Sequence, residues 1–284
     1  MTDFPLQAAE PDNSVIQSLI EQLRRHPKRV VFTEGEDLRV LKAAERLVAL
    51  EAVAPVLLGD RERIRALAAE NGVSLKFIHT INPPLASDFG IFCQRVENMA
   101  RYRSVSLGSA ADIVAKPHYF GALMVQYGQA DAVVGGNQAL PAYYFRALLH
   151  TIKPLSTVPK IFGTTLLVGP HLQHLGGSGL LFLADCGLVP NPDIQQLSAI
   201  ALETGKLAHH FLGRKVRVAM LSHSTKGSAS TPDAQKMAAA ATLAREQALR
   251  EFLDIEIEGE VQADVALDPA AAEIKLPGAE QRQS

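Results

Sequence analysis

Val216-Arg-Val-Ala-Met-Leu-Ser-His-Ser-Thr-Lys-Gly-Ser-Ala-Ser-Thr-Pro-Asp233 is the stretch that indicates most directly how this chain folds. Residues 216–221 have the length and apolar composition of a buried strand. A loop rich in hydroxyl side chains follows. Residues 231–233 then have the features of a helix start: an N-cap threonine, a proline at the first helical position and an acidic residue in the first turn. This order is typical of a cradle for an anionic group.

The same loop has a second interpretation as a tight turn made by serine and glycine, and for the loop taken alone the two are equally supported. It is not a Walker phosphate loop, because Lys226 precedes Gly227 and no second glycine has the required spacing.

Composition excludes several classes of protein. A chain of 284 residues with 47% hydrophobic content can bury a large core in two lobes. A net charge of −2 argues against a nucleic-acid partner. Cys93 and Cys186 are far apart and suit a reducing compartment. No apolar run has the length of a bilayer helix, and residues 1–14 lack the apolar region of a signal peptide. We therefore expect a cytoplasmic protein without a membrane partner.

Strand and helix patterns alternate along the chain, which implies α/β architecture with parallel sheets and helices on both faces. Pro154 and Pro159 indicate a boundary between a first lobe, residues 13–155, and a second lobe, residues 156–284. The expected strands are 29–33, 54–58, 130–134, 161–168, 179–184, 216–221 and a β-like segment at 261–267. The expected helices are 38–50, 61–71, 88–102, much of 110–127, 141–151, 193–212 and a long one after residue 231.

Ligands of such sheets bind beyond the carboxyl ends of the strands. Three loops fulfil that condition: Thr33–Asp37, Val134–Leu140 and Ser222–Ser230.

Segments around these loops carry a family resemblance. They are Val30-Val-Phe-Thr-Glu-Gly-Glu-Asp-Leu-Arg-Val40, Leu57-Leu-Gly-Asp60, His118-Tyr-Phe-Gly121, Ala130-Asp-Ala-Val-Val-Gly-Gly136, Phe182-Leu-Ala-Asp-Cys186, Met220-Leu-Ser-His-Ser-Thr-Lys-Gly-Ser228, Gly259-Glu-Val-Gln-Ala-Asp264 and Glu273-Ile-Lys-Leu-Pro-Gly278. Their order and spacing, over nearly the whole chain, resemble the phosphate acetyl/butyryltransferase (phosphotransacetylase) family.

The resemblance implies two α/β/α lobes of the isocitrate/isopropylmalate dehydrogenase type, with a cleft between the lobes and a homodimeric assembly. It also implies acyl transfer between coenzyme A and inorganic phosphate, with acetyl-CoA as the expected acyl substrate. This chemistry requires cations for phosphate, a base for the thiol and a donor for the oxyanion. We expect no metal and no permanently bound cofactor.

The resemblance assigns phosphate or acyl-phosphate binding to Arg146 and Arg101, with Arg103 as a substitute for Arg101. A solvent-exposed arginine on a helix is the alternative for each of them. His223 is expected to have a structural role, because no partner carboxylate is evident. The residues assigned to the cleft loops are Gly136, Asn137, Gln138, Ser222, Ser224, Thr225, Lys226, Gly227 and Ser228.

The chain departs from the family pattern in two places. Leu140 and Pro141 stand where the family has serine and threonine. The family's aspartate base and a serine–arginine pair follow the segment at 273–278, and residues 279–284 contain no counterpart, so the catalytic residues stay unassigned and weak or absent activity is expected. A non-catalytic coenzyme A-binding or regulatory relative is therefore an alternative. A dehydrogenase is disfavoured, since no Gly-x-Gly-x-x-Gly motif follows a strand and no aspartate cluster suits a divalent metal.

Overall fold

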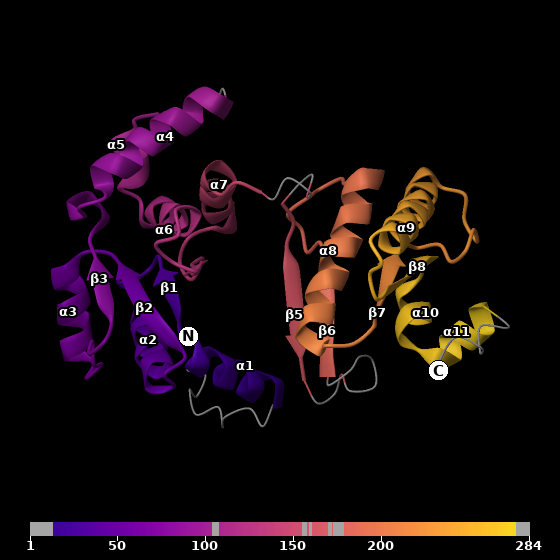
Figure 1. The fold of residues 1–284 in the computed structure, drawn as a ribbon, viewed down its shortest axis with the longest axis horizontal. Helices are drawn as coiled ribbons and strands as arrows, with labels where there is room; N and C mark the ends of the chain where they lie inside the picture. Colours follow the sequence, from indigo (N-terminus) through magenta and orange to yellow (C-terminus); the bar gives the residue numbers. More distant parts are fainter. Residues whose placement is uncertain are drawn as a thin grey trace. The chain divides into compact units, whose positions relative to one another are not determined.

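The computed structural model of the chain describes residues 14–103, 108–154, 158, 161–169, 172 and 179–276, with the backbone alone for Ser14 and residues 100–103. The chain divides into two compact units, Met1–Lys153 and Pro154–Ser284 (Figure 1). Among the described residues, the first unit has one sheet with a hydrophobic core on each face, and the second unit has two small sheets and a core of its own.

The first unit contains a four-stranded parallel sheet in the order β3-β2-β1-β4. Parallel pairing confirms the expectation from the strand–helix alternation. Since β1 lies between β2 and β4, the chain winds outward from β1 in both directions, as in doubly wound folds. The strands are β1 (Lys28–Phe32), β2 (Val53–Leu58), β3 (His79–Ile81) and β4 (Ala132–Val134).

Helices cover both faces of this sheet, because successive residues of a strand point to opposite sides. Phe32 packs in a core with residues of α2 and α3, whereas Val31 packs in the opposite core with residues of α4, α5, α6 and α7. The helices are α1 (Ser14–Arg25), α2 (Leu38–Ala49), α3 (Arg61–Glu70), the short 3-10 helix η1 (Pro83–Leu85), α4 (Phe89–Arg103), α5 (Ala110–Val114), α6 (Pro117–Gln126) and α7 (Pro141–Thr151).

A glycine permits α6 to lie against the sheet. A Cβ atom at Gly121 would be 3.1 Å from side-chain carbons of Thr33 and Val133 and 3.2 Å from one of Val31. Such distances are shorter than ordinary van der Waals contact, so the glycine in the His118–Gly121 segment has a packing role.

The second unit contains a parallel pair, β7 (Val216–Leu221) and β8 (Ile255–Val261), and an antiparallel pair, β5 (Thr164–Val168) and β6 (Leu180–Ala184). The helices α8 (Ile194–Leu212) and α9 (Pro232–Arg250) pack with β7 and β8 in one core. Short helices α10 (Ala263–Leu267) and α11 (Pro269–Lys275) follow β8. Pairing among the described strands is thus mainly parallel, with β5–β6 as the exception.

The predicted start of α9 is confirmed. Thr231 is the N-cap, its side chain accepts a hydrogen bond from Ala234 N at 3.3 Å, and Pro232 is the first helical residue. The prediction of a β-like segment at 261–267 is wrong. The strand is Ile255–Val261, where isoleucine and glutamate alternate, and residues 263–267 are helical.

Candidate active site

The loops after β1 and β4 meet at the carboxyl edge of the first sheet. β1 and β4 are neighbours in the sheet, and the helices that follow them, α2 and α7, pack on opposite faces, which is the arrangement that produces ligand sites in open α/β sheets. Thr33 N continues the ladder beyond β1 by donating to Val134 O at 3.0 Å. Two of the three loops expected to bind ligand, Thr33–Asp37 and Val134–Leu140, are therefore adjacent.

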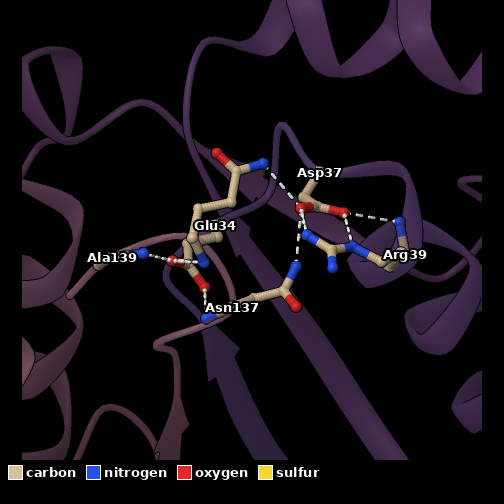
Figure 2. Close-up of polar contacts among 6 residues, drawn as sticks. Glu34, Asp37, Arg39, Asn137 and Ala139 are labelled. Carbon is tan, nitrogen blue, oxygen red and sulfur yellow. Dashed lines mark hydrogen bonds and ion pairs between the residues drawn. The ribbon is translucent and has the colours of Figure 1, made fainter. Parts of the chain in front are cut away.

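Glu34 holds the backbone of the second of these loops. Its Oε2 accepts a hydrogen bond from Asn137 N at 2.6 Å, and its Oε1 accepts from Gln138 N and Ala139 N, both at 2.7 Å (Figure 2). Burial alone would raise the pKa of Glu34, but the three amides together lower it below its ordinary value of 4.5. Glu34 is therefore an anion at neutral pH.

Asp37 holds the side chains of the same loop. Its Oδ2 accepts hydrogen bonds from Asn137 Nδ2 and Gln138 Nε2, each at 2.7 Å (Figure 2). Arg39 pairs with the same carboxylate through Nη2 at 2.8 Å and Nε at 3.1 Å. The Arg39 side chain is the main reason why the pKa of Asp37 falls from 3.8 to about 2. The amide groups of Asn137 and Gln138, expected to face a ligand, are thus hydrogen bonded within the protein.

A hollow of about 230 Å³ lies in front of these loops, lined by Thr33, Glu34, Gly35, Glu36, Asp37, Leu58, Gly59, Pro117 and Gln138. Its carboxylates all have partners, since Glu36 Oε1 accepts from Asp60 N at 2.8 Å. Three acidic side chains make this hollow unfavourable for a phosphate group.

Close packing fixes the start of α7 beside the loop. A Cβ atom on Gly135 would collide with Thr33 Oγ1 and would lie 2.6 Å from the Tyr144 ring. Tyr144 donates its hydroxyl proton to Val133 O at 3.2 Å. Burial, with a smaller contribution from the charge of Glu34, raises the pKa of Tyr144 to about 12, so the hydroxyl stays protonated and keeps donating.

Arg146 is exposed on α7, and within the described part of the chain it forms no salt bridge. Its guanidinium carbon is 5.9 Å from the centroid of the Tyr143 ring. Tyr119, from α6, lies within the electrostatic influence of Arg146, and its hydroxyl is 3.1 Å from His150 Nδ1. A cation without a carboxylate partner is available to an anionic ligand.

His118 begins the His118–Gly121 segment and is half-buried at the start of α6. Burial, and secondarily the charge of Lys116, lowers the pKa of His118. The imidazole is therefore mostly neutral at neutral pH.

The hydroxyl-rich loop of the second unit surrounds a carboxylate of the chain itself. Buried Glu260 accepts hydrogen bonds at Oε1 from Gly227 N at 2.6 Å and from Ser224 Oγ at 3.1 Å. Burial would raise the pKa of Glu260, but the Gly227 amide and the other donors lower it below 4.5. The cradle predicted from this loop thus contains an internal anion.

The remaining polar groups of this loop also have partners in the protein. Lys226 Nζ pairs with Glu258 Oε2 at 2.5 Å, and Thr225 Oγ1 donates to Gln262 Oε1 at 3.3 Å. Ser228 Oγ accepts from Thr225 N at 3.0 Å, and Ser222 Oγ accepts from Ser224 N at 3.2 Å. His223 Nε2 is 3.0 Å from Thr231 Oγ1, at the N-cap of α9, which agrees with the structural role expected for it.

A third carboxylate has the same kind of environment. Asp185 accepts hydrogen bonds at Oδ1 from Gly163 N at 2.7 Å and at Oδ2 from Leu188 N at 3.0 Å and Val189 N at 2.6 Å. Sequence reasoning did not predict the roles of Glu34, Asp185 and Glu260. The available signal was an acidic residue at or just after a strand, within two positions of a glycine.

The structure thus gathers the residues expected in the site into two groups. Gly136, Asn137 and Gln138 lie before α7, which carries Arg146, whereas Ser222, Ser224, Thr225, Lys226, Gly227 and Ser228 surround or adjoin Glu260. Leu140 is the N-cap of α7 without a side-chain capping bond, and Pro141 is its first residue. The side chains of Arg101 and Arg103 lie outside the described residues, as do residues 277–284.

Within the described ranges, no group of three or more His, Cys, Asp or Glu side chains is arranged to hold a metal ion. None of the helices described has both the length and the apolar character needed to span a membrane.

Comparison with known proteins identifies the family of this chain. A family model described as phosphate acetyl/butaryl transferase matches residues 14–284. The chain belongs to this family. A phosphate acetyltransferase of Thermoanaerobacterium thermosaccharolyticum is 33% identical over 266 residues, which are 93% of this chain and 79% of that protein.

Solved structures of family members are similar as well. A EutD phosphotransacetylase from Staphylococcus aureus has a TM-score of 0.78 and 33% identity, covering 93% of this chain and 77% of that one. A phosphotransacetylase from Streptococcus pyogenes also has a TM-score of 0.78, with 32% identity, and the match covers 93% of this chain and 78% of the other. The α/β fold expected from the sequence is therefore that of the phosphotransacetylases.

Proposed function

We propose that this protein transfers an acyl group, first of all acetyl, between coenzyme A and inorganic phosphate, with acyl phosphate and free coenzyme A as the other pair of reactants. The observation that supports this most is the 33% identity to a phosphate acetyltransferase across 93% of the chain. In this reaction a phosphate oxygen and the coenzyme A sulfur exchange at the acyl carbon. The protein must therefore hold phosphate and stabilise the oxyanion formed at that carbon.

Arg146 is the phosphate ligand in this proposal. Its planar guanidinium can donate two parallel hydrogen bonds to a phosphate, and in the described part of the chain no salt bridge competes for it. Arg146 also lies on α7, the helix that follows the loop at the carboxyl end of β4, and ligands of open α/β sheets bind at such loops. The group that deprotonates the thiol is left unassigned, and coenzyme A and acetyl-CoA are substrates here, without a permanently bound cofactor.

We extend the proposal to a cytoplasmic homodimer that acts on small molecules and has no nucleic-acid or membrane partner. The net charge of −2 supports the absence of a nucleic-acid partner.

A second candidate is a non-catalytic protein that binds coenzyme A or regulates another enzyme. The observation that favours it is that hydrogen-bond donors of two of the three predicted ligand loops, 134–140 and 222–230, are already directed to Glu34 and Glu260.

One pair of measurements separates these candidates. The purified protein is supplied with acetyl phosphate and coenzyme A, and formation of the thioester is followed; butyryl phosphate is tested in parallel. Turnover well above the rate without protein supports the acyltransferase. Turnover at background together with coenzyme A binding by calorimetry would overturn it in favour of the second candidate.

A further inference from the structure

We propose that Glu34 is a positioning residue: it serves as the resident anion of the loop at residues 137–139 and thereby orients α7 and Arg146 toward phosphate. This inference rests on the proposed function, because Arg146 is taken as the phosphate ligand.

The backbone of the loop has the form of an anion site. Three consecutive amides, those of Asn137, Gln138 and Ala139, all point at the two oxygens of one carboxylate, at 2.6–2.7 Å (Figure 2). Successive amides that converge in this way form a concave site for negative charge. Glu34 occupies that site from the loop after β1, so these amides are not free to bind a substrate phosphate.

The loop in turn determines where α7 begins. Ala139 is followed by Leu140, whose side chain makes no capping hydrogen bond, and by Pro141, which has no N–H to donate. The usual capping interaction is therefore missing, and the start of α7 is held through the preceding amides instead. Farther along the helix, the Tyr144 hydroxyl is fixed to Val133 O at 3.2 Å, two residues before Arg146.

Glu34 stays ionised near neutral pH, so its carboxylate keeps accepting the three amide hydrogen bonds. The amide hydrogen bonds keep the pKa of Glu34 below 4.5 against the opposing effect of burial. No cation competes with the amides for its oxygens in the hydrogen bonds that the described residues make, since Arg39 pairs with Asp37. Removal of the Glu34 carboxylate would leave three amides without an acceptor, so the backbone before α7 would keep only the side-chain contacts of Asn137 and Gln138 with Asp37.

The test compares Glu34→Ala with Glu36→Ala in the full chain. Glu36 lies in the same loop, but its carboxylate accepts from Asp60 N at 2.8 Å and pairs with Arg63 at 3.5 Å, and among the hydrogen bonds of the described residues it makes none to residues 137–139. We expect Glu34→Ala to raise the KM for phosphate about tenfold, corresponding to about 1.4 kcal/mol, with a smaller change in kcat. Glu36→Ala should change the KM for phosphate less than twofold.

Formate supplies the readout that a general loss of structure would not give. A formate ion can occupy the position of the missing Glu34 carboxylate, so sodium formate should lower the KM of Glu34→Ala toward the wild-type value, whereas sodium chloride at equal ionic strength should not. Formate should also raise the thermal unfolding temperature of Glu34→Ala by several degrees more than that of Glu36→Ala or the wild type.

Three results would overturn the inference: an unchanged KM in Glu34→Ala, equal effects of the two variants, or rescue by chloride as well as by formate. If Glu34→Ala does not fold, Glu34→Gln replaces it, because an amide carbonyl keeps the shape but accepts fewer of the three hydrogen bonds; it should show the same rise in KM. Absence of turnover in the wild type would contradict the proposed function instead. The thermal comparison still tests the resident anion in that case.

Discussion

The carboxylate of Glu260 lies 2.6 Å from the backbone nitrogen of Gly227, inside the loop whose hydroxyls and glycine predict an anion cradle. The same relationship joins Glu34 to Asn137 N and Asp185 to Val189 N, in each case at 2.6 Å. Three loops of the chain are therefore organised around a carboxylate supplied by the chain itself. A hydrogen bond to a charged acceptor contributes about 1.5–3 kcal/mol, so these carboxylates should be important for stability.

Replacing Glu260 by glutamine should lower the free energy of unfolding by about 2 kcal/mol, because the neutral amide accepts the Gly227 and Ser224 hydrogen bonds less strongly. Urea denaturation measures this. Glu256→Gln is the matched control on the same strand: Glu256 pairs with Lys215 at 3.2 Å at a partly exposed site, and its loss should cost less than about 1 kcal/mol. Equal costs for the two variants would contradict the role of Glu260.

Stability should fall at acid pH in a predictable range. The pKa of Asp37 is about 2 in the folded protein and 3.8 without its partners, so its contribution is complete above pH 3.8 and disappears as the pH falls toward 2. The lowered pKa values of Glu34 and Glu260 act in the same direction below 4.5. Unfolding free energies measured from pH 6 downward should therefore drop below pH 4.5. In Asp37→Asn the drop should be smaller by up to about 2 kcal/mol. If the unfolding free energy fell equally steeply with pH in Asp37→Asn and in the wild type, this account would be refuted.

Gly135→Ala should destabilise the first unit by about 2 kcal/mol or more, because the new methyl group meets Thr33 Oγ1 and the Tyr144 ring, and overpacking of this kind costs about 1–3 kcal/mol. Gly90→Ala is the control. Gly90 lies within α4 with open space around a Cβ atom, so that change should stabilise the protein by about 0.5–1 kcal/mol. Thermal unfolding of both variants tests this: relative to the wild type, the unfolding temperature should fall in Gly135→Ala and rise in Gly90→Ala.

Arg146→Lys should raise the KM for phosphate by about tenfold, since an ammonium group keeps the charge but not the paired donors, and Arg146→Ala should raise it further. Steady-state kinetics with varied phosphate measure both. Arg65→Ala provides the comparison, because Arg65 is another exposed helical arginine, paired with Glu62 at 2.9 Å. If Arg146→Ala behaves like Arg65→Ala, Arg146 is not the phosphate ligand.

Local sequence signals were sufficient to predict those elements that depend on interactions between residues close together in the chain. Thr231-Pro232 predicted the start of α9, and Pro141–Thr151 is helical over the residues expected. The alternation of isoleucine and glutamate before Val261 equally indicates β8, but that strand was predicted too late in the chain. Burial pattern and capping act within a few residues, which is why a sequence can report them.

The sequence by itself therefore determined the α/β class, the mainly parallel pairing of the strands, the loops at the strand ends and the phosphotransacetylase resemblance. The tertiary structure alone decided what those loops hold. Glu34 and Ala139 are hydrogen bonded although they are 105 positions apart in the chain, and Glu260 and Gly227 are 33 positions apart. The sequence of a loop rich in hydroxyl side chains and glycine predicts an anion site without specifying the anion. Whether that anion is a ligand or a carboxylate of the same chain depends on which strand ends fold next to it.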